Sequence, residues 1–145
     1  MTHENFMRAG LTEAQKGDLP YSAILVKDNQ IIVRGFNTAQ TDNDVSAHAE
    51  INVLRSFTKQ KKNYSLDVFK EYTLYTTCEP CPMCAAACVW AGVSEIVFGA
   101  SIEQLIAIGS EQIDLSCEAL VAKEFQDIKI TKGILAQECL ELFKK

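Results

Sequence analysis

Four cysteines and two prolines fall within one short stretch, Thr77–Trp90, which constrains the fold more than any other part of the sequence. Pro80 fixes the backbone just before Cys81, and Pro82 suits the first position of a helix, where no N–H group is needed. The stretch therefore predicts a tight turn followed by a helix over residues 81–91.

Cys81 and Cys84 are three residues apart, so at the start of a helix their sulfur atoms converge on one point. That arrangement suits a tetrahedral zinc ion, whose distance to a thiolate sulfur is about 2.3 Å.

Residues 1–5 lack a basic segment followed by an apolar one, and the longest apolar run, Met83–Val93, is shorter than the roughly 20 residues that span a bilayer. We therefore expect a cytoplasmic protein without a membrane span, where clustered cysteines indicate a metal site or a catalyst before disulfides.

Composition favours a single globular unit. The chain has 145 residues, of which 48% are hydrophobic, and we assign residues 1–145 to one domain with a buried core. Its net charge of −5 argues against strong non-specific binding to nucleic acid. Lys59, Lys61 and Lys62 form the densest basic run, which we interpret as a solvated connector.

Hydrophobic periodicity predicts helices that alternate with strands. The expected strands are Tyr21–Val26, Ile31–Gly35, Tyr72–Thr76, Ile96–Gly99 and a short one around Ile128 and Ile130. The expected helices are Thr2–Lys16, one capped by Ser46 with Ile51, Leu54 and Phe57 on one face, Cys81–Ala91, one capped by Ser101 with Gln104, Cys117–Phe125 and Ile134–Phe143. This order points to a sheet with parallel pairs that is covered on both faces, and we expect Met83, Trp90, Phe98, Cys117 and Cys139 in its core.

The second informative motif is His48-Ala49-Glu50. Residues two apart on a helix point in roughly opposite directions, so His48 and Glu50 can share a site only if a helix begins there and its first turn faces the site. We therefore expect two helix N-termini, at His48 and at Cys81, to aim at one ion.

One imidazole and two thiolates, from His48, Cys81 and Cys84, would leave the fourth zinc position open, which is the pattern of catalytic rather than structural zinc. Zinc lowers the pKa of a bound water to about 7. Glu50, beside it, can take the proton of that water and pass it to a leaving group. These residues predict a catalytic zinc site with Glu50 as the acid–base residue.

His-x-Glu combined with Pro-Cys-x-x-Cys is the signature of zinc-dependent nucleobase deaminases. The chain resembles the branch of the cytidine deaminase superfamily that carries this signature. That branch includes guanine deaminases, fungal-type cytosine deaminases and bacterial tRNA adenosine deaminases. The segments that carry the resemblance are Pro20–Lys27, Ala47–Ile51, Thr77–Cys84 and Val97–Gly99. The resemblance implies a three-layer α/β/α sandwich around a five-stranded mixed sheet, and a homodimer.

The resemblance also implies a set of substrate contacts. Asn37 is similar to the substrate-binding asparagine of these enzymes, and the backbone N–H groups of Ala49 and Cys81 are expected to meet oxygen atoms of the ring or of the reaction intermediate. Glu79 is assigned to the same substrate site, with the alternative that it lends only its backbone to the turn. Asn37 has an alternative role as a turn residue after Gly35.

Two branches of the superfamily remain open for the substrate. The motif around Cys78 looks most like that of guanine deaminases, whereas Ile130–Cys139 resembles the C-terminal region of the tRNA enzymes. Residues 101–124, which usually shape the pocket, match neither. A tRNA enzyme is expected to present a basic groove, but we interpret the densest basic run as a connector. We therefore favour a free nucleobase or nucleoside, such as guanine, and keep adenosine in tRNA as the alternative.

Two interpretations without deaminase activity also remain. Cys78, Cys81, Cys84 and Cys88 follow the cysteine spacing of bacterial ferredoxins, which would make the chain an iron–sulfur protein. Alternatively, Cys78 could join His48, Cys81 and Cys84 as a fourth ligand and close a purely structural zinc site.

Overall fold

A computed structural model describes residues 1–65 and 67–144. Its centre is a five-stranded mixed sheet in the order β2-β1-β3-β4-β5, in which β1 is antiparallel to β2 and β3 while β3, β4 and β5 are parallel. The strands are β1 (Ser22–Lys27), β2 (Gln30–Phe36), β3 (Thr73–Cys78), β4 (Glu95–Ala100) and β5 (Lys129–Thr131). The two strands expected at Tyr21–Val26 and Ile31–Gly35 pair as an antiparallel hairpin, and Asp28 and Asn29 adopt positive φ angles in its turn.

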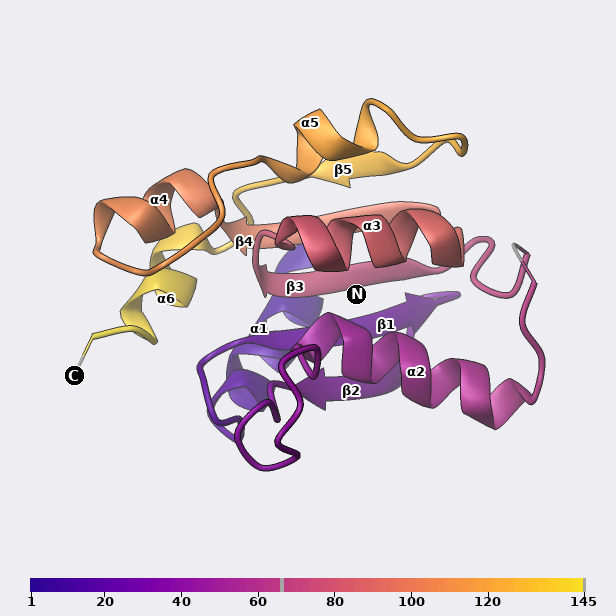
Figure 1. The fold of residues 1–145 in the computed structure, drawn as a ribbon, viewed down its shortest axis with the longest axis horizontal. Coiled ribbons are helices and arrows are strands. Elements are labelled where there is room, and N and C mark those ends of the chain that lie inside the picture. The colour runs from indigo at the N-terminus through magenta and orange to yellow at the C-terminus, as the bar shows by residue number, and fades with distance from the viewer. Residues whose placement is uncertain (66, 145) are drawn as a thin grey trace.

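Helices cover both faces of this sheet (Figure 1). On one face lie α2 (Ala49–Lys61), α3 (Pro82–Ala91) and α5 (Cys117–Val121), and on the other lie α1 (His3–Ala14), α4 (Ile102–Ala107) and α6 (Ala136–Glu141). No helix within the described residues has the length and apolar character needed to cross a bilayer. The α/β/α arrangement confirms the predicted fold class.

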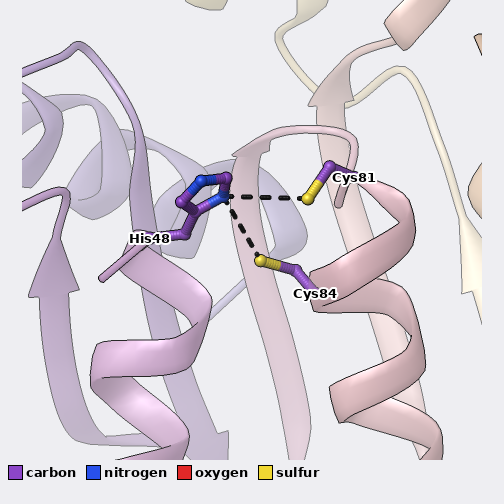
Figure 2. A group of neighbouring side chains, drawn as sticks. All are labelled: His48, Cys81 and Cys84. Atoms are coloured by element: carbon purple, nitrogen blue, oxygen red, sulfur yellow. Dashed lines mark hydrogen bonds between the residues drawn. The ribbon is translucent and has the colours of Figure 1, made fainter. Parts of the chain in front are cut away.

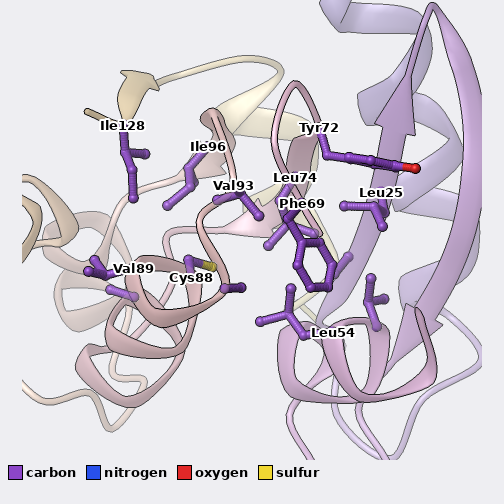
Figure 3. Packing of buried hydrophobic residues seen from close by; sticks show 14 of the residues in the cluster. Leu25, Leu54, Phe69, Tyr72, Leu74, Cys88, Val89, Val93, Ile96 and Ile128 are labelled. Atoms are coloured by element: carbon purple, nitrogen blue, oxygen red, sulfur yellow. The ribbon is translucent and has the colours of Figure 1, made fainter. Parts of the chain in front are cut away.

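The alternation of side chains along the strands produces two separate cores. In β1, Ala23 and Leu25 face α2 and α3, whereas Ile24 and Val26 face α1. On the α2 and α3 side, a continuous apolar layer runs from Leu25 to Ile128 (Figure 3). Each fully buried leucine or phenylalanine contributes about 1.5–3 kcal/mol of hydrophobic stabilisation, so this layer holds α2 and α3 firmly against the sheet.

The start of α2 differs from the prediction. His48, not Ser46, is the N-cap residue, and its backbone is extended with φ −70° and ψ 159°. The Ser46 hydroxyl and backbone N–H both donate to Asp44 in the preceding loop, which holds Ser46 outside the helix. The helix also continues to Lys61 through part of the expected connector.

Three other predictions are corrected by tertiary packing. The helix expected over Cys117–Phe125 ends at Val121, and the one expected over Ile134–Phe143 begins only after Leu135, whose φ is 54°. Trp90 and Met83 are 62% and 38% exposed rather than buried, because α3 turns Cys84, Ala85 and Cys88 toward the sheet and leaves the opposite stripe outside. Phe98, Cys117 and Cys139 are buried as predicted.

The directions of the strands gather distant parts of the chain at one end of the sheet. Tyr21 precedes β1 and Asn37 follows β2, while Glu79 and Ser101 follow β3 and β4. Because β1 is antiparallel to its neighbours, its beginning lies beside the ends of the other strands. The N-terminus of α3 is at the same end, since only a short turn separates it from β3. Several of the residues predicted for the site therefore meet at this end of the sheet.

We predict that Gly35 sets the close approach of β2 to α2. A Cβ atom at Gly35 would lie 2.6 Å from Val53 Cγ2 and 3.3 Å from the Ala49 carbonyl oxygen. We expect Gly35→Ala to lower the free energy of unfolding by about 1–3 kcal/mol through overpacking, as measured by urea denaturation. Adding Val53→Ala should cost less than the sum of the two single changes. The exposed Arg34→Ala variant is the control, and equal stability of Gly35→Ala and this control would contradict the prediction.

Candidate metal centre and active site

Three potential metal ligands converge where α2 and α3 begin (Figure 2). His48 Nδ1 lies 3.7 Å from Cys81 Sγ and 3.6 Å from Cys84 Sγ. His48 is the N-cap residue of α2, Cys81 is the N-cap residue of α3, and Cys84 follows in the first turns of α3. The structure therefore brings together the three residues that the sequence assigned to zinc.

The spacing of these atoms fits a zinc ion. An ion about 2.3 Å from each sulfur and about 2.1 Å from the nitrogen, at tetrahedral angles, places the nitrogen about 3.6 Å from each sulfur. The observed distances of 3.7 and 3.6 Å match this value. One imidazole and two thiols are also a donor set that zinc prefers.

The local backbone explains why these side chains are available. Ser, Thr, Asp or Asn at an N-cap normally bonds to the first turn of its own helix, but neither His48 nor Cys81 makes such a bond. The first backbone N–H groups of both helices therefore keep the partial positive charge of the helix ends directed at the site. That charge favours thiolate forms of the cysteines and any negative charge that develops on a substrate.

The ionisable groups of the site have shifted pKa values. Hydrogen bonding from Cys84, and then from His48, lowers the pKa of Cys81 to about 4. The hydrogen bond with Cys81 raises the pKa of His48. Burial raises the pKa of Glu50 to about 7, because the charged carboxylate is poorly solvated there.

A cavity of about 190 Å³ opens beside the three ligands. It is lined by Leu19, Tyr21, Asn37, His48, Glu50, Glu79, Cys81, Glu111 and Gln112. The predicted residues Asn37, His48, Glu50, Glu79 and Cys81 are all in this lining, while Cys84 and Ala49 are fully buried behind it. Sequence reasoning missed Leu19, Tyr21, Glu111 and Gln112. The position of Tyr21 just before a strand was a usable signal. Residues 111 and 112 fall in the stretch 101–124 that the resemblance associates with the pocket, but no motif singled them out.

Asn37 and Glu79 are both buried but are held differently. Asn37 Oδ1 accepts a hydrogen bond from the Ala39 N–H group at 3.1 Å, so Asn37 stabilises a turn and also lines the cavity. Both carboxylate oxygens of Glu79 accept backbone N–H groups, from Ile102 at 2.8 Å and Cys117 at 2.6 Å. The expectation that Glu79 lends only its backbone is therefore wrong.

The remaining cysteines of the motif do not join the metal ligands. Cys78 is buried with Phe6 and Met7 on the α1 side of the sheet, whereas Cys88 is buried on the α2 and α3 side. Among residues 1–65 and 67–144, the group able to hold a metal there contains His48, Cys81 and Cys84 alone. Neither the four-cysteine cluster of an iron–sulfur protein nor a zinc site closed by Cys78 is formed.

Comparisons with known proteins agree with this site. Residues 1–100 match the family model described as the cytidine and deoxycytidylate deaminase zinc-binding region. A tRNA-specific adenosine deaminase of Haemophilus influenzae is 39% identical over 141 residues, which cover 94% of this chain and 78% of that protein. A guanine deaminase of Bacillus subtilis is 40% identical over 105 residues, which cover 69% of this chain and 65% of that protein.

A solved structure shares the whole fold. It comes from a study of A-to-I editing by tRNA:A34 deaminases and superposes with a TM-score of 0.80 at 29% identity, covering 95% of this chain and 98% of its own. Residues 1–100, which match the family model, contain the starts of α2 and α3 that carry His48 and Cys81. The chain belongs to the cytidine and deoxycytidylate deaminase family and is a zinc-dependent deaminase of that superfamily.

Proposed function

We propose that this deaminase hydrolyses the exocyclic amine of a purine base and releases ammonia, leaving a carbonyl on the ring. The observation that carries the proposal is the single cavity of about 190 Å³ that joins the metal ligands to Glu50 and Asn37. Its volume is below the roughly 300–1,000 Å³ of pockets that hold drug-sized ligands, so it suits one planar base. The relatives named above are named for guanine, which is a purine base, and for adenosine, which carries one.

In this proposal His48, Cys81 and Cys84 would hold the zinc ion, which would supply Lewis acidity to activate a water molecule. Glu50 takes a proton from the water and delivers it to the departing amine. Burial suits Glu50 to this exchange, because a carboxyl group with a pKa near neutrality can both accept and return a proton. The Ala49 and Cys81 N–H groups, at the positive ends of α2 and α3, would stabilise charge on the reacting group.

Adenosine in tRNA is the first candidate substrate. Several similar proteins are tRNA-specific adenosine deaminases, and these span more of the chain than the guanine deaminase does. A tRNA substrate would have to turn one base out of its stack to enter a cavity of this size. An open groove of about 760 Å³ shares Leu19, Tyr21 and Glu111 with the cavity and could receive the adjoining nucleotide.

A free purine such as guanine is the second candidate, favoured by the charge of that groove. Its lining in the described chain includes Asp18 and Glu111 but neither lysine nor arginine. Phosphate groups are usually held by basic side chains, so this groove offers little attraction to an RNA backbone. The net charge of −5 likewise gives the chain as a whole little attraction to an RNA backbone.

Ammonia release from a matched panel distinguishes the candidates. The panel contains guanine, adenine, adenosine, cytosine and an anticodon stem-loop RNA with adenosine at the turn. Turnover of one purine substrate, free or in RNA, supports the proposal. Turnover of cytosine alone would overturn the assignment to purines.

We predict that zinc binding depends on Cys84 and not on Cys78. Cys84→Ser should weaken zinc affinity by more than about 100-fold, because loss of even an outer partner of a zinc ligand costs 10–100-fold. Cys78→Ala should retain one zinc ion per chain, since Cys78 faces the other core. Metal content after dialysis against a chelator, measured by plasma mass spectrometry, tests both variants. Loss of zinc from Cys78→Ala would show that the site has a fourth protein ligand.

We predict that Glu50→Gln keeps the zinc ion and the fold but lowers kcat by about 10²–10⁴-fold, the usual contribution of a general acid–base group. The amide has the same shape but cannot carry the proton. The control is Glu103→Gln, which removes an exposed carboxylate from α4 and should leave kcat unchanged. Circular dichroism and metal content establish that both variants are folded and loaded. A kcat within threefold of wild type for Glu50→Gln would contradict the assigned role.

A further inference from the structure

The segment between α4 and α5 brings two polar residues, Glu111 and Gln112, into the wall of the cavity, and hydrogen bonds hold the side chain of Gln112 there. Gln112 Nε2 donates to the Tyr21 hydroxyl at 2.9 Å and to the Ser110 hydroxyl at 3.2 Å. An amide NH₂ group carries two hydrogens, so these two bonds use both of them. The acceptor Oε1 is therefore the part of the Gln112 amide that is available to a ligand.

Tyr21 ties this amide to the sheet. Tyr21 lies directly before β1 and lines the same cavity. Its hydroxyl therefore holds the Gln112 amide in one orientation relative to the sheet. Burial raises the pKa of Tyr21, so the phenol stays protonated and neutral. Gln112 is thus oriented by a neighbour from the rigid part of the fold.

One carboxylate fixes both ends of the segment that carries Gln112. Glu79 accepts the N–H of Ile102, the first residue of α4, at 2.8 Å, and the N–H of Cys117, the first residue of α5, at 2.6 Å. Such N–H groups have no partner within their own helices. The Glu79 N–H itself donates to the Ala100 carbonyl at 2.7 Å, which ties this clamp to the turn that precedes Cys81.

We propose that Gln112 is a specificity-determining residue of the cavity, whose Oε1 accepts a hydrogen bond from an N–H group of the purine base, and that Glu79 is the positioning residue that holds it there. The inference rests on the proposed function and names the residue that recognises the base. We assign Glu79 a positioning role because each of its oxygens accepts the backbone N–H group that begins a helix at one end of residues 102–117.

The first experiment compares Gln112→Met with wild type on the panel purine that has the highest kcat/KM. Loss of this acceptor leaves a buried N–H of the base unpaired, so KM should rise about 5- to 100-fold while kcat changes less than threefold. The ratio of kcat/KM between the two best purines should also change by more than about fivefold. Gln60→Met, on the exposed side of α2, is the control. An unchanged KM in Gln112→Met would overturn the inference.

The second experiment tests the clamp through coupling and through amide exchange. Glu79→Gln places an NH₂ group against a backbone N–H, so the amides of Ile102 and Cys117 should exchange at least about tenfold faster in the zinc-loaded protein. Glu118→Gln, an exposed change in the first turn of α5, is the control. Glu79→Gln and Tyr21→Phe should each raise KM in the wild-type background but add little to Gln112→Met.

Independent, additive effects of Glu79 and Gln112, or unchanged exchange at Ile102 and Cys117, would overturn the positioning role. Failure of the proposed function gives a different result. In that case the zinc-loaded wild-type protein would release no ammonia from any purine, whereas failure of this inference alone leaves wild-type turnover intact with normal KM in the variants.

Discussion

The site depends on the convergence of two helix N-termini on one point. His48 and Cys81 occupy N-cap positions, where the backbone is still extended and the side chain is free to point beyond the end of the helix. The mixed sheet beneath α2 and α3, and the apolar layer between helices and sheet, fix the distance between the two caps. Metal ligation, thiolate stabilisation and the proposed charge stabilisation at Ala49 and Cys81 all use this single arrangement.

Two buried carboxylates in the same cavity, Glu79 and Glu50, have different roles. Glu79 accepts two backbone N–H groups, which satisfies its oxygens and makes it a structural anchor. Glu50 is buried at the start of α2, and its raised pKa reflects a carboxylate that is poorly solvated beside the metal ligands. One carboxylate of the cavity therefore orders the backbone, and the other lies where it can transfer a proton.

Much of the fold and of the site followed from local pattern. Gly92 ends α3 with a positive φ of 84°, and Ser101 with Gln104 forms the expected capping box. The errors arose where tertiary contacts outweighed that pattern, as at Ser46, which Asp44 holds outside α2, and at Trp90, which packs against the exposed Phe125 instead of the core. The single-domain assignment, the cytoplasmic location and the homodimer stay predictions.

The sequence by itself determined the chemistry, because the spacing of His48, Glu50, Cys81 and Cys84 suits one metal ion and one proton carrier only when both helices begin at these residues. Only the tertiary structure decided what surrounds that chemistry. Gln112 and Tyr21 are 91 residues apart in the chain and meet through the sheet and the Glu79 clamp, a contact that no local periodicity encodes. Substrate recognition depends on such long-range contacts, whereas the metal ligands depend mainly on short-range geometry.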